Sequence, residues 1–275
     1  MLSKVLKYEF RDATRTLLPL GGGALVLAAL TGLIGLLRRN ASALLENQIV
    51  GVITFTVELI TMLGLMAVMF ICIFFCVNRF YRMLGEQGYL EMALPVTPNQ
   101  HIAGKVICGM VCTLGAIVVM VLCGLLISWP DLSLSDLIFW QGLPIQAVPI
   151  LLSMFVTLLA GLFAFYLNFY FCVAVGAQFP QHRMGASVVC FFVMQFVGQI
   201  LSVALLSFLG WVGNLLNLEP AIEQFFLHIR EMDDMTAMVG MCCALFLMIA
   251  LIFIAVGAIL WAVTQYLIGK KLNLA

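Results

Sequence analysis

The residues of this chain that could do chemistry are few and stand among long apolar segments. Glu58 is the only acid placed clearly inside such a segment, and an ionisable residue in an apolar span is a functional-site hypothesis by default. Gln195 and Gln199 are four residues apart, so they share one face of a helix. These three residues form a candidate polar path. Two alternatives stay open: Glu58 faces water near the end of its segment, and the glutamines hydrogen-bond neighbouring helices.

The cysteines are the second group with chemical potential. Cys72 and Cys76, and likewise Cys108 and Cys112, have the i, i+4 spacing that puts two thiols on one helix face. Together with 16 methionines they could serve a soft metal. We favour apolar packing, because Cys and Met are adaptable fillers between helices. We therefore predict no metal site, and no disulfide framework, since none of the nine cysteines lies in an outer loop.

Several motifs of catalytic proteins are missing from the sequence. It has no G-x-x-x-x-G-K-[ST] loop to hold the phosphates of ATP, no H-E-x-x-H zinc pattern and no G-x-S-x-G nucleophile turn. We therefore expect that the chain is not an enzyme, has no catalytic residues and binds no cofactor itself.

The elements that position these residues are six apolar segments, each long enough to cross a bilayer at 1.5 Å per helical residue. Hydrophobic residues make up 64% of the 275-residue chain and charged residues 9%, against about 25% charged in a typical soluble domain. The sequence thus predicts an all-α, polytopic membrane protein with a single domain over residues 1–275. We place the membrane-spanning helices at residues 17–37, 52–77, 102–127, 147–173, 185–211 and 238–267.

The distribution of basic residues predicts the orientation of the spans. With the N-terminus inside, ten of the thirteen Lys and Arg residues lie on the inner side and three on the outer side. Because inner loops of membrane proteins are rich in Lys and Arg, this favours cytoplasmic positions for both termini. The three outer basic residues are Arg38, Arg39 and Arg230.

Residues 1–16 are predicted to form a separate interfacial amphipathic helix. At 100° per residue, apolar side chains such as Phe10 gather on one face and basic side chains on the other. Glu9 does not suit a simple lipid anchor and is expected to contact protein. The alternative is a basic flank that only orients the first span. The residues assigned to this helix are Lys4, Lys7, Glu9, Phe10, Arg11 and Arg15.

The inner loop after the second span mixes charge with aromatic and aliphatic residues. A short helix over 86–93, ended by Pro95 and Pro98, would offer Tyr89 and Leu90 for burial. Such an element could dock in a groove of a partner, or it could pack only against the spans of its own chain. The spacing leaves both interpretations open.

Several stretches of the sequence resemble a family of bacterial type-2 ABC transporter permease subunits. They are Leu2-Ser3-Lys4-Val5-Leu6-Lys7-Tyr8-Glu9-Phe10, Leu17-Leu18-Pro19-Leu20, Gly85-Glu86-Gln87-Gly88-Tyr89-Leu90, Leu94-Pro95-Val96-Thr97-Pro98-Asn99-Gln100 and Lys271-Leu272-Asn273-Leu274. The last four spans resemble the family only in hydropathy. Two departures are Gln87, where the family commonly has an acidic or small residue, and Ala275, where an acid is common.

The resemblance implies an exporter subunit of the bacterial plasma membrane with both termini in the cytoplasm. In that family two permease subunits, identical or different, pair on two cytoplasmic ATPases that bind ATP and Mg²⁺. A coupling helix between the second and third spans fits a cleft of the ATPase, beside the interfacial helix. The coupling residues would be Glu86, Gln87, Gly88, Tyr89, Leu90 and Glu91.

Two other function classes fit the same layout. An ion-driven secondary carrier would use buried charges and often internal repeats; only Glu58 qualifies as such a charge, and no clear repeat is present. A membrane scaffold without transport would recruit a cytoplasmic protein through the same loop. The sequence does not identify the cargo, and peptides, lipids, drugs and sodium are all compatible with it. No partner is expected to be a nucleic acid.

Overall fold

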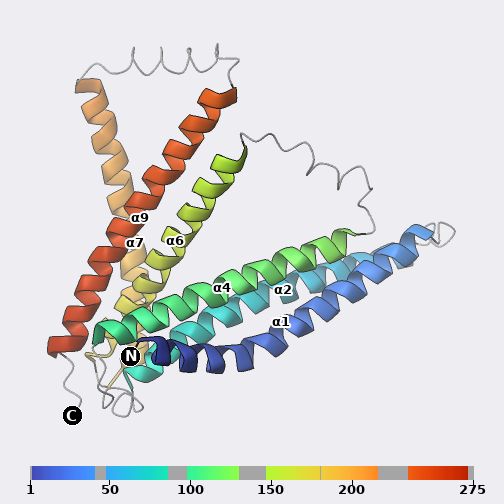
Figure 1. Cartoon of the computed structure of the whole chain (residues 1–275), viewed down its shortest axis with the longest axis horizontal. Helices are drawn as coiled ribbons and strands as arrows, with labels where there is room; N and C mark the ends of the chain where they lie inside the picture. The colour runs from blue at the N-terminus through green and yellow to red at the C-terminus, as the bar shows by residue number, and fades with distance from the viewer. Residues whose placement is uncertain are drawn as a thin grey trace. The chain divides into compact units, whose positions relative to one another are not determined.

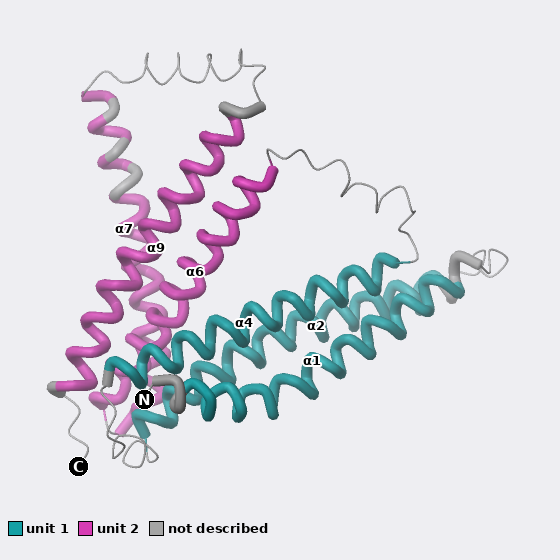
Figure 2. The backbone as a smooth tube through the Cα atoms, in the orientation of Figure 1, with its two compact units in different colours: residues 1–142 teal, residues 143–275 magenta. Residues whose placement is uncertain are grey.

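The structure is a computed structural model of the chain, and α-helix is the only regular secondary structure among the residues that it describes. This confirms the all-α prediction at the level of fold class. Contacts divide the chain into two compact units, residues 1–142 and 143–275, which are considered separately (Figure 2). The prediction of one membrane domain over the whole chain stays a prediction. The described residues are 2–40, 48–85, 98–129, 147–179, 181–215 and 235–271.

Among the described residues, each unit has three long helices. Within each unit these helices pack against one another (Figure 1). The helices of unit 1, each of which contacts the other two, are α1 (Leu2–Asn40), α2 (Gln48–Met83) and α4 (Pro98–Ser128). In unit 2 the first helix contacts both others, and the helices are α6 (Ala147–Gly176), α7 (Arg183–Leu215) and α9 (Met235–Lys271).

All six helices are long and apolar enough to cross a bilayer, which confirms six candidate membrane spans. The helices extend beyond most of the predicted boundaries, because hydropathy marks the lipid-facing part of a helix and not its hydrogen-bonded ends. Many large apolar side chains are exposed, for example Phe74 at 66% and Phe196 at 65%. Exposed apolar surface on every helix suits a lipid environment better than water.

The predicted interfacial helix and the predicted first span are continuous with each other in the structure. Residues 2–40 form one uninterrupted helix with Pro19 inside it, and α1 bends within its first half (Figure 1). A proline inside a helix removes one backbone hydrogen bond and commonly bends the helix instead of ending it. Whether residues 2–16 lie along a membrane surface stays a prediction.

Small residues let the helices of unit 1 approach closely. Ala24 and Ala28 of α1 pack with Leu65 of α2 and Cys123 of α4 in a buried cluster. Beyond this cluster, the buried hydroxyls of Thr31 and Thr61 lie 2.9 Å apart and join α1 to α2. Hydrogen bonds of this kind hold helices together in lipid, where the hydrophobic effect gives no preference for helix contact.

Unit 2 is organised around α6. Tyr166, Leu167 and Tyr170 of this helix are fully buried. Thr157 donates a hydrogen bond of 2.8 Å to the backbone oxygen of Phe246 in α9. Unit 2 thus combines buried aromatic side chains with a cross-helix hydrogen bond to backbone.

Candidate functional site

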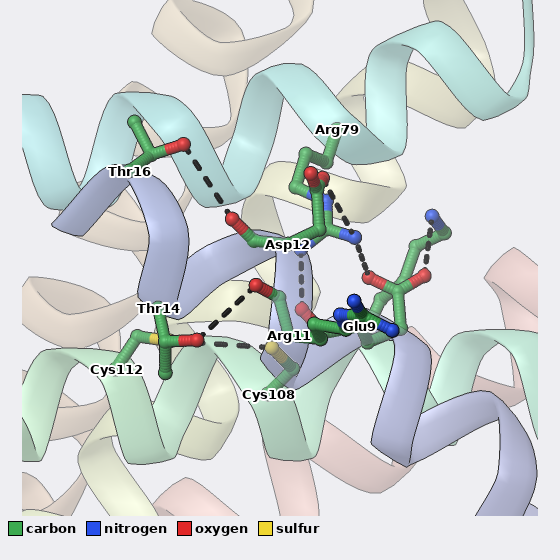
Figure 3. Close-up of polar contacts among 9 residues, drawn as sticks. Glu9, Arg11, Asp12, Thr14, Thr16, Arg79, Cys108 and Cys112 are labelled. Atoms are coloured by element: carbon green, nitrogen blue, oxygen red, sulfur yellow. Dashed lines mark hydrogen bonds and ion pairs between the residues drawn. The ribbon is translucent and has the colours of Figure 1, made fainter. Parts of the chain in front are cut away.

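The most conspicuous polar site in the described part of unit 1 is a cluster of charges from three helices (Figure 3). Glu9 and Asp12 come from α1, Arg79 from α2 and Lys105 from α4. Two acids and two bases leave the cluster with no formal net charge. We call these four residues the charge cluster.

Glu9 is the centre of the charge cluster. One of its carboxylate oxygens, Oε2, lies 2.5 Å from Nη2 of Arg79, and the other, Oε1, accepts a hydrogen bond of 3.0 Å from Nζ of Lys105. Nη1 of Arg79 also donates to the backbone oxygen of Glu9 at 2.9 Å. Arg79 therefore grips both the side chain and the backbone of α1, a forked geometry that lysine cannot reproduce.

Burial separates the strong contacts of the charge cluster from the weak one. The side chains of Lys105 and Glu9 are only 4% and 12% exposed, and that of Arg79 is 18% exposed. Asp12 lies 3.4 Å from Arg79 but is 65% exposed, so solvent screens its contribution. The Arg79 guanidinium also lies 5.7 Å from the centre of the Phe75 ring, a favourable cation–π distance.

The two bases of the charge cluster lie near the ends of their helices. Arg79 lies one turn before the end of α2 at Met83, and Lys105 lies two turns after the start of α4 at Pro98. These two helix ends flank residues 86–97. Both are therefore held to the first turns of α1 by ion pairs with Glu9. A displacement of either helix end would pull on the same carboxylate.

Four thiols lie near the charge cluster at the contact of α2 and α4. Cys108 and Cys112 have their sulfurs 4.0 Å apart, and Cys76 interacts with both Cys72 and Cys112. None of the nine cysteines, all of which lie in described helices, forms a disulfide bond. No group of three or more metal-ligating side chains in the described ranges is arranged to hold a metal ion.

The residues predicted for the interfacial helix divide into two sets. Glu9 contacts protein, as expected, and Phe10 is partly buried. Lys7, Arg11 and Arg15 are exposed. The side chain of Lys4 lies outside the described residues, and so do all six predicted coupling residues, 86–91.

The three residues of the candidate polar path belong to different units, so each is described within its own unit. Glu58 is exposed on α2 in unit 1, whereas Gln195 and Gln199 are exposed on α7 in unit 2. Each of the three side chains is thus on the outer surface of its own unit. Their role as a translocation path stays a prediction.

Sequence reasoning missed the partners of Glu9. Arg79 and Lys105 were counted only among the ten basic residues of the inner side, and Asp12 was not assigned any role. A signal was present: both bases fall at the ends of apolar spans, where an unpaired charge next to lipid is costly. The two acids of residues 1–16, Glu9 and Asp12, were the natural counter-charges.

The fold and the charge cluster define the chain as a polytopic helical membrane protein with an ion-paired helix junction. No family model, no curated protein and no solved structure matches the chain.

Proposed function

We propose that the chain is the membrane-spanning permease subunit of an ATP-binding-cassette exporter in a bacterial plasma membrane. A separate cytoplasmic ATPase would bind ATP and Mg²⁺ and dock on residues 86–91, and a second permease subunit would complete the transporter. The cargo would be a peptide, lipid or drug. The proposal combines the resemblance of the loop sequence with one structural observation, the fastening of both flanking helix ends to Glu9.

The charge cluster suits a device that passes force from a loop into a helix bundle. A push on residues 86–97 reaches α2 near Arg79 and α4 near Lys105, and both bases hold the carboxylate of Glu9. The N-terminal part of α1 would then move together with the other two helices. Because packed interfaces switch between discrete arrangements, such a concerted shift can bias the permease between its inward-open and outward-open states.

The test uses the double substitution Tyr89→Ala and Leu90→Ala in the full-length chain. We expect normal membrane insertion but loss of an ABC ATPase that co-purifies with the wild-type protein, because the docking side chains are gone. The matched control is Tyr8→Ala. Tyr8 is 71% exposed and lies on α1, outside the loop, and this variant should retain the ATPase.

Two results would overturn the proposal. Wild-type protein that never associates with an ATPase in its own membranes would favour a scaffold with a different partner. Purified chain that carries out proton- or sodium-driven flux without ATP would favour a secondary carrier.

A further inference from the structure

An open apolar groove with a volume of about 260 Å³ lies within unit 1, where α1, α2 and α4 meet. Its walls include Leu17 and Leu18 of α1, Val68 of α2, and Val111 and Val119 of α4. All three helices are candidate membrane spans. A groove of this composition inside a bilayer cannot hold water favourably, so an apolar group is the occupant that it favours.

One edge of the groove continues into two exposed cations. Lys7, Arg11, Thr14 and Leu18 follow one another at spacings of four, three and four residues, which places them in one strip along α1. Thr14 and Leu18 line the groove, and Phe10 is its most N-terminal lining residue on α1. Lys7 precedes Phe10 and Arg11 follows it, and the side chains of both cations are exposed. In order from the N-terminus, the strip therefore reads cationic, cationic, polar and apolar.

We propose that the groove seats an acyl chain of an anionic membrane phospholipid whose phosphate lies against Lys7 and Arg11. The order of chemistry along the strip matches that of the lipid, with a charged head, a polar ester region and an apolar tail. The predicted cytoplasmic side of α1 also faces the leaflet in which anionic lipids attract basic residues. This inference stands whether or not the chain serves an ABC exporter.

The headgroup, and not the tail, decides which lipid binds. Any lipid tail is as apolar as the groove, so occupation of the groove gives shape complementarity but little preference between lipids. The preference comes from Lys7 and Arg11. The exposed position of both side chains leaves them accessible to a phosphate.

The groove is tested by filling it. A side chain that starts at Gly115, which lines the groove, would meet no heavy atom of the protein within 4 Å at its first carbon, and the same holds for Gly124 on the same helix outside the groove. We expect Gly115→Leu to remove most of the phosphatidylglycerol that the detergent-purified full chain retains in native mass spectrometry. The matched control Gly124→Leu should retain it. Equal retention in both variants, or separation of an oligomer by Gly115→Leu with lipid still bound, would overturn the proposal.

The headgroup is tested with Lys7→Gln and Arg11→Gln, which leave the groove intact. We expect each substitution to weaken phosphatidylglycerol binding about fivefold, because a basic residue near an anionic headgroup contributes about this factor. Binding of phosphatidylcholine should not change. Unaltered preference for phosphatidylglycerol in the double variant would refute the assignment, even if Gly115→Leu failed to fold.

Discussion

Glu9 has a structural role that its neighbours in the sequence do not indicate. Its carboxylate forms ion pairs with two cations that belong to two other helices, in surroundings from which water is largely excluded. A buried ion pair adds little net stability compared with an apolar replacement, but removal of one partner leaves an uncompensated charge. The substitution of Glu9 should therefore cost more stability than its intact ion pairs contribute.

Glu9→Gln should destabilise the protein by about 3 kcal/mol, because Arg79 and Lys105 would lose the buried carboxylate that both contact. The effect would be measured as the loss of unfolding free energy in mixed micelles of mild detergent and dodecyl sulfate. The control is Asp12→Asn, which removes an acid from the same cluster. Its cost should stay below about 1 kcal/mol, because Asp12 is 65% exposed. Equal effects of the two variants would contradict the central position assigned to Glu9.

At the scale of helices, close approach depends on residues without side chains. A Cβ atom added at Gly32 of α1 would overlap the backbone oxygen of Leu126 in α4. Backbone cannot move aside as a flexible side chain can, so any larger residue must push the two helices apart. By contrast, nothing lies within 4 Å of a Cβ built at Gly22 on the same helix.

Gly32→Ala is expected to lower the unfolding free energy by about 2 kcal/mol, a usual cost of overpacking. Gly22→Ala should be neutral or should raise it by up to about 1 kcal/mol, because alanine favours helix more than glycine does. Thermal unfolding in detergent, followed by circular dichroism, compares the two variants. A stabilised Gly32→Ala protein would show that α1 and α4 do not meet at this position.

The helices could be predicted from sequence because about 20 apolar residues in a row leave no other structure in lipid. The full extent of α1 could not be predicted from sequence, because Pro19 and the three glycines that follow suit either a bend or a break. The partners of Glu9 are separated from it by 70 and 96 residues. Helical periodicity describes one helix at a time, so it gives no information about which charges meet across helices.

At the scale of the whole molecule, the two units have the same number of described candidate spans. Three of the six lie in residues 1–142 and three in residues 143–275. An odd number of crossings moves the chain to the opposite side of a membrane, and a second odd number returns it. The end of unit 1 should thus lie opposite both termini. The excess of basic residues predicts that the termini lie in the cytoplasm.

Reporter fusions test this topology directly. Alkaline phosphatase fused after residue 142 should be active, because the enzyme folds only outside the cytoplasm, whereas the same enzyme fused after Ala275 should be inactive. A fluorescent protein that folds only in the cytoplasm should give the reverse pattern and controls for expression. The outer side would then carry few basic residues and the charge cluster would face the cytoplasm, where an ATPase could reach residues 86–91. Phosphatase activity at both fusion points would require an even number of crossings in residues 143–275 and would contradict three spans in unit 2. An inactive fusion after residue 142 would place the charge cluster on the outer side and would rule out force transmission from a cytoplasmic engine through Glu9.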